Sequence, residues 1–181
     1  MKERSNNIIH TKGISKFSTI LIISGFVVFL IIYWIVKPRL QTPHEQTPLV
    51  ACRSNLKMIS LAIQMYADDN SGFFPPSEKW CDSINSYLGD DTNIILRCPA
   101  IRDDICHYAI NPNCEPDSPD NTVLLFETKD GGWNLSGGPE LSTNENHKEK
   151  VCNVLFNDGT VKSIKKEDIL NLNWSGKRKN E

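Results

Sequence analysis

The chain has 181 residues, a formal net charge of −2 and a hydrophobic content of 39%, which suit one compact domain with its own core. The near balance of acidic and basic residues gives no electrostatic case for binding nucleic acid. Because the sequence has neither C-x-x-C nor C-x-x-C-H, it argues against thioredoxin chemistry and c-type haem attachment.

Residues 17–36 form an uncharged, strongly apolar run and are predicted to be a transmembrane helix. Twenty residues give a helix of about 30 Å, which matches the hydrocarbon layer of a bilayer. Basic residues before the run outnumber those that closely follow it. We therefore expect residues 1–16 to be a cytoplasmic tail and the C-terminal domain to be extracytoplasmic, with the chain in a bacterial inner membrane. The run is longer than the core of a signal peptide and lacks its cleavage site.

Residues 37–48 contain three prolines and are expected to form a linker. An extracytoplasmic domain is predicted over 49–174, with a basic tail over 175–181. The domain opens with an amphipathic helix that ends near 68–72, and the early cysteine is a residue of this helix, not a lipidation site. Apolar residues recur in it at intervals of four and three, namely at Cys52, Leu56, Ile59, Ile63 and Tyr66.

Further elements follow from local patterns. Residues 80–88 are predicted to form a short helix capped by Ser77, and 94–96, 108–110 and 122–126 are predicted strands. Residues 130–139, which contain four glycines, are a loop. The segments 151–156 and 160–164 form a hairpin with a turn at 157–159, and 166–172 close the domain. The sequence predicts an α+β fold: one N-terminal transmembrane helix, then an amphipathic helix packed on a small antiparallel sheet.

Six cysteines follow the apolar run. An even number outside the cytoplasm favours disulfides, with the pairing open, and free buried thiols are the main alternative. Zinc is a weaker alternative: Cys98, Cys106, His107 and Cys114 are ligand types, but they lack the close pairs of structural zinc sites, and no metal site is predicted. The disulfide candidates are Cys52, Cys81, Cys98, Cys106, Cys114 and Cys152.

The sequence predicts no catalytic residue, no cofactor-binding residue and no enzyme activity. His147 with Asp158 is the tempting pair for acid–base chemistry, but a hydrogen bond in a loop explains the histidine and a turn explains Asp158-Gly159. Residues 68–70 offer carboxylate and amide oxygens, which are the ligands of calcium. The end of a helix accounts for those residues, and we expect no cofactor.

Several motifs point to a known family. Cys52 precedes Ser-Asn-Leu-Lys, Tyr-Ala-Asp-Asp-Asn ends the helix, and a Gly-aromatic-Pro turn follows at 72–76. Arg97-Cys98-Pro99 and residues 108–111 match as well, as does His147 followed by the strand and turn that contain Asp158-Gly159. In these features the chain resembles type II secretion pseudopilin-like proteins with a prepilin-type H-x9-DG domain, found in planctomycete- and verrucomicrobia-type bacteria.

The resemblance implies a pseudopilin-like fold and a non-enzymatic, membrane-anchored envelope protein. Its role would be structural, in the assembly of a type II secretion or type IV pilus-like system. The implied partners are the lipid bilayer, through 17–36, and secretion or pilus assembly proteins. The alternative is a membrane-tethered extracytoplasmic module, not processed as a prepilin, that binds a ligand or protein at the loop 130–139.

Overall fold

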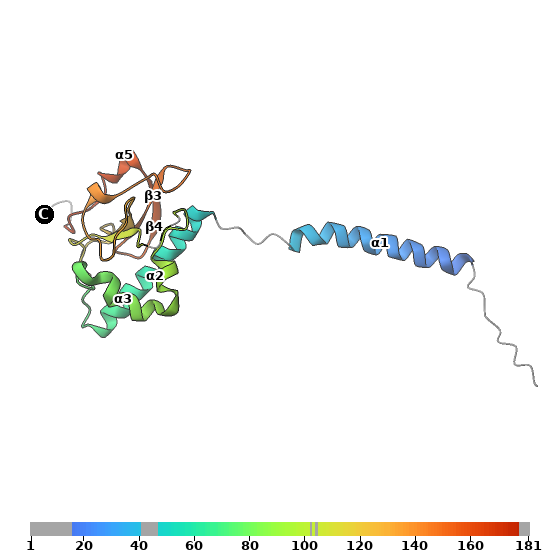
Figure 1. Cartoon of the computed structure of the whole chain (residues 1–181), viewed down its shortest axis with the longest axis horizontal. Helices are drawn as coiled ribbons and strands as arrows, with labels where there is room; N and C mark the ends of the chain where they lie inside the picture. Colours follow the sequence, from blue (N-terminus) through green and yellow to red (C-terminus); the bar gives the residue numbers. More distant parts are fainter. Residues whose placement is uncertain (1–15, 41–46, 102, 104, 178–181) are drawn as a thin grey trace, which may run out of the picture. The chain divides into compact units, whose positions relative to one another are not determined.

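The computed structural model describes residues 16–40, 47–101, 103 and 105–177 (Figure 1). The chain divides near residue 45 into two units, each considered by itself. Residues 1–15 of the predicted tail (1–16), residues 41–46 of the predicted linker and the last four residues of the chain lie outside the described residues. The first unit contributes α1 (Lys16–Leu40), which continues past Pro38, the first proline of the predicted linker.

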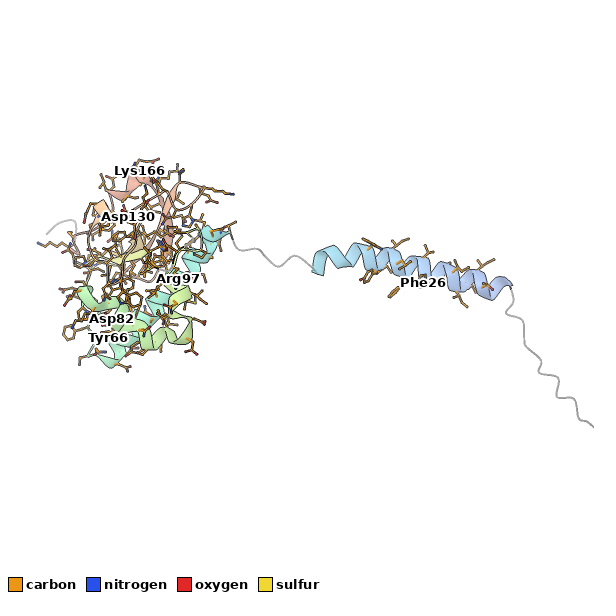
Figure 2. All side chains as sticks on the ribbon, viewed as in Figure 1. Phe26, Tyr66, Asp82, Arg97, Asp130 and Lys166 are labelled. Carbon is orange, nitrogen blue, oxygen red and sulfur yellow. The ribbon has the colours of Figure 1, made fainter. Side chains whose placement is uncertain are left out.

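Large apolar side chains are exposed along α1. Ile20 is 64% exposed, Phe26 62% and Trp34 70%, and such side chains project from several sides of the helix (Figure 2). A membrane span needs an apolar surface that is also long enough to cross roughly 30 Å of hydrocarbon. Among the described residues, no helix meets both requirements. The prediction of a transmembrane helix over 17–36 is therefore wrong.

The second unit is built on α2 (Pro48–Asp69), which packs against α3 (Trp80–Leu88) and against the sheet (Figure 1). The predicted apolar stripe is confirmed, and the helix ends near the predicted position. Gly72 follows it with a φ of 85°, in the left-handed region that glycine tolerates. The residues of the stripe with no exposed surface are Cys52, Leu56, Ile59 and Ile63.

Four antiparallel strands form one sheet in the order β1-β2-β3-β4, so the α+β class is as expected. The strands are β1 (Tyr108–Ile110), β2 (Val123–Glu127), β3 (Val151–Phe156) and β4 (Val161–Lys165). Side chains alternate between the two faces of a strand. Tyr108 therefore packs in the cluster with α2, whereas Ala109 packs in a second cluster that includes Ile169 of α5 (Lys166–Ile169). Apolar contacts thus cover both faces.

The predicted hairpin of β3 and β4 is confirmed. The two strands pair without a break from Val151 opposite Lys165 to Leu155 opposite Val161. Gly159 has a φ of 76° in the turn. Asp158 Oδ1 accepts hydrogen bonds from the backbone N–H and the hydroxyl of Thr160, at 2.8 and 2.7 Å. Asp158 and Gly159 therefore build the turn.

Two local predictions are wrong. Residues 94–96 are not a strand, because the short helix α4 (Thr92–Ile95) follows a 3-10 turn over Gly89–Asp91. The Thr92 hydroxyl donates to the carbonyl of Gly89 at 2.8 Å and stabilises this turn. Ser77 does not cap α3, because it begins another 3-10 turn (Ser77–Lys79) and forms no capping hydrogen bond. A third 3-10 turn covers Pro139–Leu141.

Replacement of Leu56 by alanine should destabilise the second unit by about 2–5 kcal/mol, since it leaves a cavity between α2 and the sheet. The matched control is Leu61→Ala on the same helix, where the side chain is 58% exposed and the change should stay within about 0.5 kcal/mol. Urea denaturation measures both variants. Equal effects would show that α2 does not pack through its predicted stripe.

Candidate functional site

Four buried side chains from distant parts of the sequence meet in the second unit: Cys52, Cys98, Glu127 and His147. One thiol, carboxylate or imidazole atom from each lies within 4.8 Å of all the others. The two cysteines and the glutamate have no exposed surface, and the histidine is 3% exposed. We call these four residues the Cys-Glu-His cluster. Thiolate, imidazole and carboxylate are the groups that bind zinc in proteins.

The two cysteines reach the cluster from α2 and from the segment that follows α4. Cys52 lies on the buried stripe of α2, so the helical period itself points it inward. Asn55 on the same helix donates its side-chain N–H to the carbonyl of Arg97 at 3.0 Å. This bond places Cys98 beside α2, with the two Sγ atoms 3.0 Å apart.

Glu127 ends β2 and holds the sheet side of the cluster. Its Oε2 accepts the backbone N–H of Asn153 at 2.8 Å, and its Oε1 accepts the side-chain N–H of Asn153 at 3.0 Å. Oε1 also lies 2.9 Å from Nε2 of His147. A buried carboxylate is costly unless it is paired and hydrogen-bonded, and these three contacts fulfil that requirement.

His147 lies in the loop before β3. The N–H of Lys150 donates to the His147 carbonyl at 3.1 Å, and Lys150 takes a φ of 55° in this tight turn. Asn146 anchors the loop to the carbonyl of Thr128 at 2.9 Å. Ten residues separate His147 from Asp158, one more than in the H-x9-DG motif. Because this loop lies before the regular β3–β4 ladder, the extra residue does not disturb the strand register. Nδ1 of His147 is buried and has no hydrogen-bond partner among the described residues.

Contacts within the cluster shift the pKa values of His147, Cys98 and Cys52. Burial lowers the pKa of His147, but the contacts with Cys98 and Glu127 outweigh burial and raise it to about 10. The hydrogen bond from Cys52 holds the pKa of Cys98 below its usual range, with a smaller contribution from His147. The same hydrogen bond, together with burial, raises the pKa of Cys52. The geometry thus favours a Cys98 thiolate beside a protonated His147.

All six cysteines are buried free thiols in the structure, and their pairing stays a prediction. Two pairs lie close: Cys52 with Cys98, and Cys81 with Cys106, whose Sγ atoms are 3.9 Å apart. Cys114 instead contacts Asn157, at 3.6 Å. Cys152 contacts the backbone carbonyl of Glu127, and burial raises its pKa to about 12.

The zinc ligands considered from sequence spacing do not come together. His107 accepts the N–H of Cys98 at Nδ1 and pairs with Asp103 at Nε2. Cys106 faces Cys81, so Cys98 alone of that set joins the cluster. Sequence reasoning also missed Glu127. The available signal was its position, a single carboxylate at the end of the apolar strand Val-Leu-Leu-Phe-Glu, since a buried charge requires dedicated partners.

The other sequence-predicted positions have ordinary roles. His147 and Asp158 do not form a pair, because His147 binds Glu127 and Asp158 binds Thr160. At residues 68–70, which were considered for calcium and then assigned to the end of a helix, Asp69 accepts a hydrogen bond from the hydroxyl of Tyr87 at 2.9 Å.

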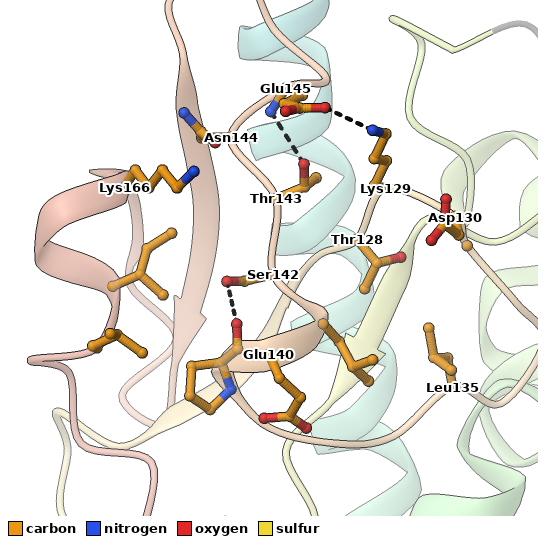
Figure 3. Close-up of a pocket in the computed structure, with 15 residues that line it drawn as sticks. Thr128, Lys129, Asp130, Leu135, Glu140, Ser142, Thr143, Asn144, Glu145 and Lys166 are labelled. Atoms are coloured by element: carbon orange, nitrogen blue, oxygen red, sulfur yellow. Dashed lines mark hydrogen bonds and ion pairs between the residues drawn. The ribbon is translucent and has the colours of Figure 1, made fainter.

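A separate pocket of about 440 Å³ lies beside the glycine-rich loop, between residues 128–131, 139–145 and α5 (Figure 3). Lys129 and Glu145 form an ion pair of 2.8 Å there. Thr128 lines the pocket, and its buried hydroxyl has no hydrogen-bond partner among the described residues. The loop 130–139 thus contributes to a concave surface.

Replacement of Glu127 by alanine should destabilise the second unit by about 3–5 kcal/mol, because it leaves the buried groups of Asn153 and His147 without their acceptor. The control is Glu145→Ala, which removes an exposed ion pair and should leave the unfolding midpoint unchanged. Urea denaturation measures the unfolding midpoints of both variants, and an unchanged m-value shows that a shifted midpoint reflects a change in stability. A midpoint for Glu127→Ala equal to that of the control would contradict the structural role of this carboxylate.

Comparisons of the chain with known protein families, with curated proteins and with solved structures found no match.

Proposed function

We propose that the chain is a non-enzymatic structural or interaction protein, pseudopilin-like, that serves an extracytoplasmic assembly of the type II secretion or type IV pilus kind. The observation that carries this proposal is the convergence of the motif residues. Three separate motif blocks, represented by Cys52, Cys98 and His147, meet in one buried cluster. The remaining motif, Asp158-Gly159, builds the β3–β4 turn. The motifs by which the chain resembles that family therefore have structural roles in this fold.

The geometry of the cluster favours a structural over a catalytic role. In a nucleophile–histidine–acid relay, one imidazole nitrogen faces the nucleophile and the other faces the carboxylate. Here Nε2 of His147 faces both Cys98, at 4.0 Å, and Glu127, at 2.9 Å. The cluster is also enclosed, so a substrate would have to open the domain to reach Cys98.

Deletion of the gene in its native cell tests the assembly role. We expect a subset of proteins to be reduced several-fold in the culture medium, or surface filaments to be lost, with recovery when the full chain is supplied again. Quantitative mass spectrometry of the medium and electron microscopy of the cells provide the readouts. If the medium and the cell surface are both unchanged, the chain has no such assembly role.

One observation favours a second candidate, a module that binds a small ligand in the pocket beside the loop 130–139. Nine of its fifteen lining residues are polar or charged, and apolar surface from Leu135, Leu141 and the end of α5 completes it. Thr128, which lines it, has a buried hydroxyl without a hydrogen-bond partner among the described residues. Convergent polar groups beside apolar surface are typical of ligand sites. Lys166 at its edge offers a cation (Figure 3).

A screen of small fragments by ligand-observed NMR tests this second candidate. The variants Leu170→Glu and Lys166→Glu alter exposed residues at the pocket and should preserve the fold. We expect fragments that bind the full chain to lose most of their signal with both variants. Binding that persists in both would place the fragments elsewhere and contradict a ligand site in this pocket.

A further inference from the structure

We propose that the Cys-Glu-His cluster binds one zinc ion, through the thiolates of Cys52 and Cys98, a carboxylate oxygen of Glu127 and Nε2 of His147. This inference goes beyond the assembly role and does not depend on it. It also departs from the expectation that the chain has no metal site. The four groups offer four ligand atoms of the types that bind zinc in proteins, two sulfurs, one nitrogen and one oxygen, all within 4.8 Å of one another.

The distances between the four groups suit a zinc site after small movements. Two thiolates bound tetrahedrally to zinc at about 2.3 Å would be about 3.8 Å apart, against 3.0 Å between Sγ of Cys52 and Sγ of Cys98. Nε2 of His147 is 2.9 Å from Oε1 of Glu127 and 4.0 Å from Sγ of Cys98. Shifts of roughly 1 Å would therefore open room for an ion at the centre.

The orientation of His147 provides an independent observation. One nitrogen, Nε2, faces both Glu127 and Cys98, so the ring points a single atom at a shared centre. With Nε2 bound to zinc, the ring is neutral and its proton lies on Nδ1, which has no acceptor among the described residues. The support for zinc is therefore the position of Nε2 between the thiol of Cys98 and the carboxylate of Glu127.

The net charge of the proposed zinc site and the hydrogen bonds that orient its ligands also suit zinc. Two thiolates, one carboxylate and Zn²⁺ sum to one negative charge, which lies between the neutral sites built from two cysteines with two histidines and the doubly negative sites built from four cysteines. Metal ligands need hydrogen bonds that orient them. Asn153 supplies two for Glu127, and its side chain also donates to the carbonyl of Leu49 on α2, at 3.3 Å. The carboxylate is therefore held in place before an ion arrives.

Spectroscopy of the intact chain tests the proposal. The reduced, chelator-treated full chain should bind one Co²⁺, with thiolate charge-transfer and tetrahedral d–d absorption bands, and Zn²⁺ should displace it. X-ray absorption of the zinc form should show two sulfur ligands at about 2.3 Å and two nitrogen or oxygen ligands at about 2.0–2.2 Å. This measurement needs no variant. The absence of the bands, or a shell without two sulfurs, would overturn the proposal.

Variants locate the site. We expect Cys98→Ser and His147→Gln to weaken cobalt binding by more than roughly 100-fold, since each removes a ligand, and Asn153→Ala to weaken it by roughly 10–100-fold. The matched control is Cys114→Ser, a buried thiol outside the cluster, which should bind cobalt like the unaltered chain. Binding that survives in Cys98→Ser and His147→Gln, or that is lost in Cys114→Ser with its fold intact, would refute this site.

The competing use of the two thiols gives a final test. A disulfide between Cys52 and Cys98 would remove both sulfur ligands, so the two states exclude each other. The protein isolated from its native cells should yield both cysteines as thiols after alkylation under denaturing, non-reducing conditions with a chelator. A Cys52–Cys98 disulfide found by mass spectrometry would overturn the zinc site and leave the proposed assembly role standing.

Discussion

The buried carboxylate of Glu127 is the constraint on which the rest of the second unit depends. A charge without exposed surface is tolerated only with close partners, and Glu127 takes them from two other segments. Asn153 provides a backbone and a side-chain donor from β3, and His147 approaches from the loop before that strand. The end of β2 therefore cannot move independently of β3 or of this loop. The Asn153 side chain extends the same network to Leu49 at the start of α2.

This network joins segments that the chain separates by long stretches. Cys52 and Cys98 close a loop of 46 residues, and Glu127 and His147 close one of 20. Closing such loops costs conformational entropy that increases slowly with their length, so the contacts at the cluster and the apolar packing around them must together outweigh that cost. The polar groups that converge between α2 and the sheet thus hold distant segments of the chain together, and they are also candidate metal ligands.

The sequence correctly predicted the elements that are marked by a regular pattern among neighbouring residues. The stripe at Cys52, Leu56 and Ile59 determined the buried face of α2, and Gly159 determined the hairpin turn. The run Ile94-Ile95-Leu96 was misread, because a short apolar segment has no period that separates a strand from a helical turn. For 17–36, composition indicated a span and the helices of the described residues do not provide one.

The cluster could be predicted only in part, for a different physical reason. The spacing of residues in the sequence reveals metal ligands that lie close together in the chain. These four groups instead come from α2, the segment after α4, the end of β2 and the loop before β3. Cys52, Cys98 and His147 were recognised as motif residues, yet nothing local connects them. Glu127 completes the set, and only the pairing of β2 with β3 brings Asn153 to its carboxylate.

Charge balance at Glu127 links the metal-free and the metal-bound forms. Burial lowers the pKa of His147, but the contacts with Cys98 and Glu127 raise it to about 10, which favours a positive charge on the ring beside this carboxylate when no metal is bound. A zinc ion at the centre would take over that role, and the ring would become neutral. Metal ligands must give up their protons to bind, so proton and metal compete for one position. The geometry that places Nε2 of His147 between a thiolate and a carboxylate therefore suits a cation at this centre, whichever cation occupies it.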